Sequence, residues 1–160
     1  MEINLFKKAK FERVADEFRK HPDNTDCFVQ LPTRATQYSV AYDIYAPIDY
    51  TIMPHCDKMI WTDIKAKFPK NMALLINVRS SMGKSHIQLA NTQGWIESDY
   101  YGNESNDGNI GIMLSNFGDE PYEIKCGDRI AQCMLIKYCT FANGNTKKKR
   151  KGGFGSSNGN

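Results

Sequence analysis

The sequence lacks the features that would place the chain in a membrane or outside the cell. None of its 160 residues belongs to an apolar run approaching the roughly 18 residues needed to cross a bilayer. Its first ten residues, MEINLFKKAK, carry charges where a signal peptide needs an apolar core. We therefore expect a cytoplasmic protein that does not contact a membrane.

The five cysteines and three histidines are scattered along the chain. No two cysteines form a CxxC pair, and an odd set in a chain without a secretion signal argues against a disulfide framework or a zinc knuckle. The histidines suggest no metal site either. We expect the cysteines to be reduced and to serve mostly in packing.

The net charge of +3 comes from one segment. Residues 147–151 supply five positive charges, so the other residues sum to −2. A broad basic face for duplex nucleic acid is therefore not supported, and we expect no direct nucleic-acid binding.

Short strands separated by turn residues dominate the chain after Pro22. Alternating or continuous apolar residues of strand length occupy residues 59–68, 72–78, 110–114 and 129–138. Many short strands at such spacing predict an all-β fold of the barrel or jelly-roll type. At 160 residues, the size indicates one domain with one core.

The two ends of the chain differ from this pattern. Phe11, Val14, Ala15 and Phe18 recur at helical spacing, which predicts a short amphipathic helix over about residues 9–20. Residues 141–160 are rich in glycine and polar residues and cannot pack a core. We expect a β domain over residues 1–140, followed by a flexible C-terminal arm over residues 141–160.

Two polar segments could bind phosphate, although each is also compatible with an ordinary turn or a solubilising tail. NVRSSMGKS (77–85) places an arginine and two hydroxyls at a strand end, where they suit phosphoryl oxygens. KRKGGFGSS (149–157) combines cations, glycines, hydroxyls and one phenylalanine, a set that suits a phosphate chain with an attached ring.

Three further segments are ambiguous by themselves. In SVAYDIYAP (39–47), the single acid Asp43 could satisfy backbone donors or hold waters around a metal ion. GDRIAQ (127–132) reads as a turn entering a strand. GWIESDYYG (94–102) sets two acids, Glu97 and Asp99, between glycines.

These segments occur together in a fixed order, as VAYDIYAP, RSSMGKS, NTQGWIESDYYG, GDRIAQ and KRKGGFGSSNG, and they span residues 40–159. In this combination the chain resembles the trimeric dUTP pyrophosphatase (dUTPase) family. It is most similar to the Gram-positive bacterial and phage branch, in which the loop of the third motif is extended, as in YYGNESNDGNIGI here.

The resemblance implies a fold, an activity and an assembly. Members have a β jelly roll (β-clip) and form homotrimers whose active sites draw residues from all three chains. They hydrolyse dUTP to dUMP and pyrophosphate with Mg2+, by attack of water on the α-phosphorus, which limits uracil in DNA and supplies dUMP. The C-terminal arm closes over a neighbouring site, which excludes water.

The resemblance also implies the roles of particular residues. Uracil would be read by a hairpin pocket formed by Asn91, Gly94, Trp95 and Ile96, and Tyr100 would pack against the deoxyribose and exclude a 2′-hydroxyl. The phosphates would be bound by Arg79, Ser80, Ser81 and Gln132. Asp43 would contact waters around an Mg2+ that the triphosphate itself holds. From the arm, the terminal phosphate and the uracil ring would be contacted by Arg150, Phe154, Gly155 and Ser156.

Glu97 departs from the family pattern. The family has aspartate at this position, in Gly-x-Ile-Asp before the tyrosine, whereas this chain has Gly-Trp-Ile-Glu. Glu97 is therefore expected to activate the water, with Arg79 as the second catalytic residue. The extra methylene moves the carboxylate by on the order of 1 Å, and a misplacement of that size can cost roughly 10²-fold in rate. We expect a dUTP diphosphatase with reduced turnover, or an engineered variant site.

Two other functions occur on this fold. Some phage-type members engage repressor proteins, so a nucleotide-dependent regulatory protein with a repressor partner is the alternative. A dCTP deaminase needs an additional glutamate beyond the third motif, and the corresponding stretch, IGIMLSNFG (110–118), contains none.

Overall fold

The computed structural model describes residues 9–21, 28–144, 146, 147, 150 and 152. Within these residues the chain forms eleven β-strands, one short α-helix and two 3₁₀ turns. All the strand pairings are antiparallel. The prediction of an all-β, jelly-roll-like fold is confirmed.

The larger sheet carries several of the predicted site residues, including Asp43, Gln132 and Glu97. Its strand order is β2–β11–β6–β8, and these strands span, in that order, Tyr42–Tyr45, Arg129–Lys137, Met72–Asn77 and Gly94–Glu97. The strands predicted over residues 72–78 and 129–138 are thereby confirmed as β6 and β11. The register sets Gln132 opposite Asn77, at the end of β6, and Glu97 opposite Ala73, near its start.

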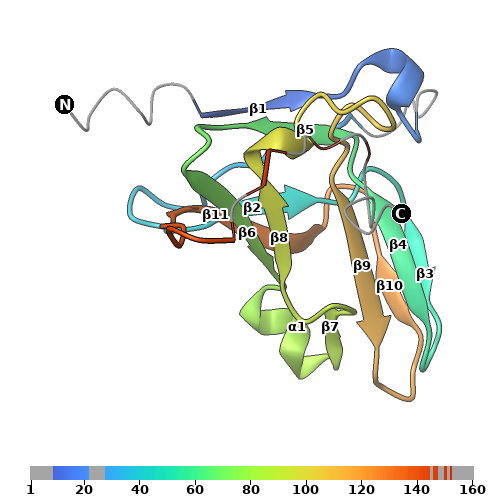
Figure 1. The fold of residues 1–160 in the computed structure, drawn as a ribbon. Coiled ribbons are helices and arrows are strands. Elements are labelled where there is room, and N and C mark those ends of the chain that lie inside the picture. Colours follow the sequence, from blue (N-terminus) through green and yellow to red (C-terminus); the bar gives the residue numbers. More distant parts are fainter. Residues whose placement is uncertain (1–8, 22–27, 145, 148–149, 151, 153–160) are drawn as a thin grey trace.

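The remaining strands form three smaller sheets. A three-stranded sheet has the order β4–β9–β7, with bounds Asp57–Trp61, Gly111–Asn116 and Ile87–Leu89. The pair of β10 (Tyr122–Ile124) and β3 (Tyr50–Ile52) lies on the same side of the molecule as β4 and β9, as Figure 1 shows. The third sheet pairs β1 (Lys10–Arg13) with β5 (Ile64–Lys67).

Aliphatic side chains from these sheets share one core. Ile44 and Leu74 of the larger sheet belong to the same buried cluster as Ile60, Leu114 and Ile124 of the smaller ones. Burying a side chain of this size stabilises the fold by roughly 1.5–3 kcal/mol. Because one core joins the sheets, the positions of the site residues relative to one another are fixed by the packing.

The N-terminal helix predicted over about residues 9–20 is wrong. Lys10–Arg13 form β1 in register with β5, and Asp16–Phe18 form a single 3₁₀ turn. The Phe11 ring packs on Tyr42 at a centroid distance of 5.6 Å. The Ala15 N–H donates to the Asp107 carboxylate at 2.8 Å, whereas an α-helix would direct it to residue 11. Pairing with β5 overrides the helical spacing.

The single strand predicted over residues 59–68 is interrupted at Asp63. β4 ends at Trp61 and β5 begins at Ile64, and Asp63 between them has a φ of 55°. Its buried carboxylate accepts the N–H groups of Lys20 and His21, each at 2.9 Å. These bonds stabilise a left-handed corner that apolar alternation does not signal.

Two other expectations are tested in part. Cys56, Cys133 and Cys139 are free, but Cys126 is disulfide-bonded, so the expectation of reduced cysteines is wrong there. Among the described residues, no helix is long and apolar enough to cross a membrane. The division at residue 140 stays a prediction, since most of the arm lies outside the described residues.

Candidate active site

The first group of site residues surrounds the carboxylate of Asp43 on β2. Its backbone lies opposite Gln132 of β11, and its N–H donates to the Thr33 carbonyl oxygen at 2.8 Å. The carboxylate pairs with Arg79 at 2.9 Å and with Arg129 at 3.6 Å. One nearly buried acid thus holds two guanidinium groups side by side.

Arg79 lies in the wall of two adjoining hollows, and Arg129 in the wall of one of them. A cavity of about 400 Å³ is lined by Asp43, Arg79 and Gln132 together with residues 35, 39–41 and 134. A second, of about 240 Å³, has Arg79 and Arg129 in its wall with Ser81 and Asp128. Guanidinium and hydroxyl groups converging on a concave surface suit phosphoryl oxygens.

The helix α1 (Ser80–Lys84) places the two serines of this group. Arg79 is its N-cap residue, in an extended conformation, so the chain turns directly from β6 into the helix. Ser80 and Ser81 are exposed in the first turn. On the other side, the Gln132 side-chain amide donates to the Val78 carbonyl oxygen at 3.2 Å. The structure thus brings together the predicted phosphate-binding residues Arg79, Ser81 and Gln132.

A second group of residues lines a narrow slot. β7 pairs with β9, whereas β8 pairs with β6, so residues 87–97 cross from one sheet to another. The crossing leaves a hollow of about 250 Å³ between β8 and β9. Its wall contains all four residues predicted to read uracil, which are Asn91, Gly94, Trp95 and Ile96.

Gly94 fits this position for a steric reason. A Cβ atom there would lie 3.1 Å from the Cβ of Ile76 on the neighbouring strand. Glycine therefore lets β8 approach β6 closely at the base of the slot. A slot lined mainly by backbone and apolar side chains suits a flat, hydrogen-bonding ring.

Glu97 ends β8 at the edge of the slot and is followed by a 3₁₀ turn, Ser98–Tyr100. Its carboxylate is exposed and lies 2.9 Å from the Arg150 guanidinium. Arg150 also pairs with Asp99 at 3.4 Å, and its guanidinium carbon lies 5.4 Å from the centre of the Tyr100 ring. Arg150 is the arm residue that the resemblance assigns to phosphate binding. In this structure it contacts Glu97, the candidate base.

Tyr100 is buried beneath these charged groups. Its hydroxyl donates to the Asn109 carbonyl oxygen at 2.7 Å and accepts from the Asn106 amide at 2.8 Å. Burial raises the pKa of the phenol above its ordinary value of 10.0, against the opposing effect of Asn106 and Arg150. The phenol is therefore neutral at physiological pH and acts as a fixed surface instead of an acid or base.

Glu97 and Arg79 lie toward opposite ends of β6. Glu97 faces Ala73, and Arg79 follows Ala73 by six residues, past the end of the strand. At about 3.3 Å per residue, the separation along the strand is on the order of 20 Å. Figure 1 shows α1 at one end of the larger sheet and the turn after β8 at the other.

Three contributors were missed by sequence reasoning. Arg129 was treated as part of an ordinary turn, although the Asp-Arg pair at a strand entry could have indicated it. Asp99, the second acid of GWIESDYYG, has no role predicted from the sequence, yet it pairs with Arg150. Asn106 belongs to an extended loop whose contacts had no sequence signal. Phe154, Gly155 and Ser156 lie outside the described residues, so their roles stay predictions.

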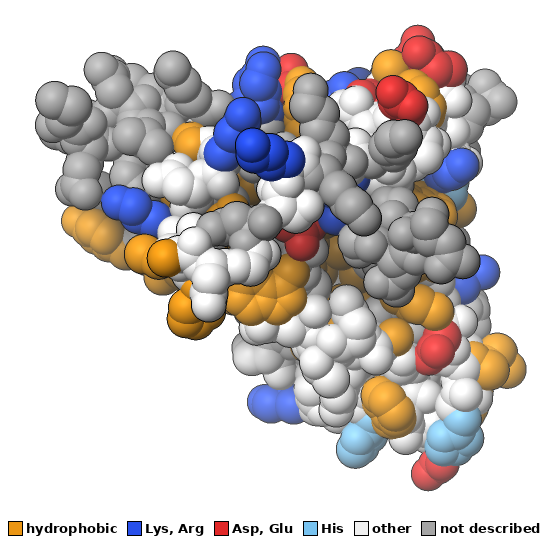
Figure 2. Space-filling view, viewed as in Figure 1, with side chains coloured by type: hydrophobic (Ala, Val, Ile, Leu, Met, Phe, Trp, Pro, Cys, Tyr) orange, Lys and Arg blue, Asp and Glu red, His pale blue; other side chains and the backbone are white. Residues whose placement is uncertain are grey.

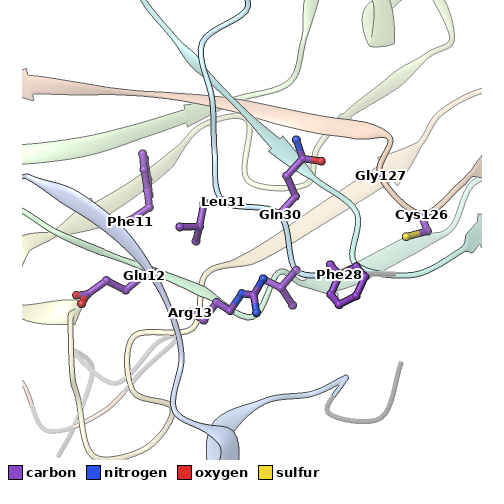
Figure 3. A pocket seen from close by; sticks show the side chains of 9 residues that line it. Phe11, Glu12, Arg13, Phe28, Gln30, Leu31, Cys126 and Gly127 are labelled. Atoms are coloured by element: carbon purple, nitrogen blue, oxygen red, sulfur yellow. The ribbon is translucent and has the colours of Figure 1, made fainter. Parts of the chain in front are cut away.

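A larger hollow lies elsewhere on the surface. It has a volume of about 950 Å³ and is lined by residues 11–13, 28–31, 126 and 127. Figure 3 shows side chains from β1 and from residues 28–31 around it. None of the predicted site residues lines it, so size alone does not identify the active site.

The described residues fit an indirectly held Mg2+. Among them, no three His, Cys, Asp or Glu side chains form a group that could hold a metal ion. Mg2+ prefers oxygen ligands, keeps several waters and is commonly held by substrate phosphates. Asp43 lies in the wall of the phosphate-side cavity, and the contact of its carboxylate with metal-bound water stays a prediction.

Charges are distributed over the visible surface without one dominant sign. Figure 2 shows Lys and Arg side chains in separate groups among acidic and hydrophobic ones on the described part of this face. The arginines of the candidate site are individual residues paired with specific acids, as Arg79 is with Asp43.

Comparison with known proteins assigns the chain to a family. The sequence model of the dUTPase family matches residues 28–158. The deoxyuridine 5′-triphosphate nucleotidohydrolase of Lactococcus lactis is 35% identical over 132 residues, which cover 80% of this chain and 87% of the relative. The mouse enzyme of the same name is 35% identical over 130 residues, covering 78% and 76%.

Solved structures show the same fold. The dUTPase of Streptococcus mutans superposes with a TM-score of 0.71 at 24% identity, covering 82% of this chain and 97% of that one. The dUTPase of Staphylococcus bacteriophage 80alpha gives 0.65 at 18% identity, covering 89% and 97%. With the family model matched over most of its length and relatives of this similarity, the chain belongs to the dUTPase family.

Proposed function

We propose that this chain is a dUTP diphosphatase, which hydrolyses dUTP to dUMP and pyrophosphate by attack of water on the α-phosphorus, with Mg2+ as cofactor. The observation that carries the proposal is the order of groups along one segment. The slot wall (Gly94–Ile96), a carboxylate (Glu97) and a buried ring (Tyr100) follow one another within seven residues. A nucleoside whose base fills the slot therefore lies close to Glu97 and Tyr100.

In this proposal Glu97 orients and deprotonates the attacking water. A general base must lie within hydrogen-bonding reach of the proton it takes, and Glu97 is an exposed carboxylate that directly follows Ile96 of the slot wall. Phosphoryl transfer depends mainly on positioning and on neutralising charge. Bound Mg2+ supplies part of that charge neutralisation, while Arg79 and Arg129 supply the part that belongs to this chain.

Arg150 has a second task in this account. Without substrate, its guanidinium contacts the carboxylates of Glu97 and Asp99. A triphosphate carries more negative charge than either carboxylate, and guanidinium binds phosphate bidentately. We infer that Arg150 transfers to the substrate phosphates on binding, which frees Glu97 for its water. Stacking of Phe154 on the uracil ring belongs to the same proposal.

The separation along β6 supports a site shared between copies of the chain. Groups that act on one α-phosphorus must lie within several ångströms of it. Glu97 and Arg79 are on the order of 20 Å apart along the strand within one chain. We propose that the slot of one copy meets the phosphate-binding group of another, in a homotrimer of the type the resemblance implies.

The activity is tested with the purified full chain, dUTP and Mg2+. The expected result is dUMP and pyrophosphate in equal amounts, with no reaction of dCTP. Release of ammonia from dCTP would instead identify a deaminase. Binding of dUTP without turnover would identify a nucleotide-dependent regulatory protein, and a pull-down with and without dUTP would then search for its repressor partner.

Sharing of the site is tested separately by mixing two inactive variants. Glu97→Gln removes the base and Arg79→Ala removes the phosphate contact. Co-expressed with different tags and purified through both tags as mixed trimers, they should recover about a third of the wild-type rate, because one of the three sites in each mixed trimer combines both intact groups. If each site used one chain only, mixing would restore nothing.

A further inference from the structure

We propose that Asn106 is a positioning residue that fixes the ring of Tyr100 and thereby sets discrimination between deoxyribonucleotides and ribonucleotides. The inference rests on the proposed function, in which Tyr100 packs against the deoxyribose. It assigns a task to the extended loop of residues 102–109, which joins the turn after β8 to β9 and which the mechanism above does not use.

The loop is packed against the body although its sequence, GNESNDGN, is polar. Asn103, Asn106 and Asn109 are 8%, 9% and 0% exposed. Buried amides are costly unless they are hydrogen-bonded. Their bonds are therefore the reason for the loop's conformation.

Asn106 uses both ends of its amide. Its nitrogen donates to the Tyr100 hydroxyl at 2.8 Å. Its oxygen accepts from the Gly108 N–H at 3.0 Å and from the Asn103 amide at 2.6 Å. One side chain thus connects the phenol of Tyr100 to the backbone and to a second side chain of the loop.

Tyr100 is also held at its backbone. The Asn103 amide donates to the Tyr100 carbonyl oxygen at 2.8 Å. Gly108 approaches so closely that a Cβ atom there would lie 2.8 Å from the same oxygen, and its φ of +84° also favours glycine. With the two bonds to its hydroxyl, the ring is fixed at both ends, so neither tilting nor sliding is free.

The loop is itself attached to the rigid part of the fold. The Asp107 carboxylate accepts from the Ala15 N–H at 2.8 Å and pairs with Lys65 of β5. The Asn109 amide donates to the Asp63 carboxylate at 2.8 Å. Figure 1 shows the loop beside the segment that follows β1. Asn106 therefore holds Tyr100 against an anchored structure.

Discrimination against a 2′-hydroxyl by packing requires an accurately placed ring. A pocket that rejects one added group by contact alone discriminates about 10–200-fold. A tilt that opened room for one oxygen atom would remove much of that factor. The bond from Asn106 is the side-chain contact that opposes such a tilt at the hydroxyl end of the ring.

Asn106→Asp is the decisive variant. It keeps an oxygen for the Gly108 N–H but replaces the donor to Tyr100 with a second acceptor. We expect the ratio of kcat/KM for UTP to kcat/KM for dUTP to rise about tenfold. Most of the change should come from a lower KM for UTP, while kcat for dUTP should change little. Glu104→Ala, an exposed residue of the same loop, should leave the ratio unchanged.

The Tyr100→Phe background separates positioning from a general loss of stability. In the absence of the hydroxyl, Asn106→Asp should no longer change the ratio, since the contact through which it acts is gone. Tyr100→Phe alone should also raise kcat/KM for UTP relative to dUTP, which keeps the test valid if Asn106→Asp fails to fold. Equal losses for dUTP and UTP, or the same effect in both backgrounds, would overturn the inference. Failure of the wild type to hydrolyse dUTP would instead overturn the proposed function.

Discussion

Replacing Glu97 with aspartate should raise the rate of dUTP hydrolysis, and the position of the carboxylate sets the size of the change. The shorter side chain withdraws the carboxylate by on the order of 1 Å toward the position the family pattern uses, and a displacement of this size changes rates by roughly 10²-fold. The same withdrawal stretches the 2.9 Å contact with Arg150.

The loss of the Arg150 contact has little effect on kcat, because in the proposed mechanism Arg150 contacts the substrate phosphates once dUTP is bound. The Glu97 side chain is 56% exposed, and exposed ion pairs contribute about 1 kcal/mol or less, equivalent to roughly fivefold. The free Asp and Glu side chains differ in pKa by only about 0.4 units, so basicity changes little. Geometry therefore dominates, and the net gain should lie between about tenfold and a hundredfold.

The assay is pyrophosphate release at saturating dUTP with Mg2+, comparing kcat for both forms. Asp99→Glu is a matched control, because it changes an acid of similar exposure that also pairs with Arg150; its kcat should stay within about twofold. If Glu97→Asp is no faster than the wild type, the position of this carboxylate does not limit the reaction and the reasoning is refuted.

Three further predictions concern stability and reactivity. Asn109→Ala removes bonds to the Asp63 carboxylate and N–H and should lower the free energy of unfolding in urea by about 3 kcal/mol; a loss below about 1 kcal/mol would contradict the packed-loop account. Tyr101 donates to Glu12 at 2.6 Å and lowers the pKa of that carboxyl below its ordinary value of 4.5. Tyr101→Phe should therefore lower the free energy of unfolding by about 0.5 kcal/mol at neutral pH. The difference from the wild type should disappear as the pH falls through the lowered pKa of Glu12. Urea titrations at several pH values would measure it. Burial raises the pKa of Cys133 to about 12, so iodoacetamide at pH 8 should label it only after unfolding, as peptide mass spectrometry would show.

The central strands could be predicted from the sequence because their signal is local. Continuous apolar residues form β6, and the long apolar run after Gly127 forms β11. The N-terminal segment could not be predicted, since its conformation depends on the edge of β5, about 50 residues away. The corner at Asp63 depends on backbone donors at Lys20 and His21, which periodicity does not reveal.

The candidate site was predictable in its parts but not in its arrangement. The types of residue in each motif indicated phosphate, base and sugar contacts, and the slot residues do meet around one hollow. The register that separates Glu97 from Arg79 along β6 appears only in the fold. The same is true of Asn106, whose bond to Tyr100 has no sequence pattern of its own.

The central claim, hydrolysis of dUTP with Glu97 as the base, is tested most directly by comparing the wild type with Glu97→Gln. Glutamine keeps the length of the side chain and removes its basicity together with the charge that pairs with Arg150. We expect measurable turnover of dUTP by the wild type, a kcat lower by about 10²–10⁴-fold in the variant, and dUTP binding that is no weaker than in the wild type. Equal kcat values for the two proteins would contradict it.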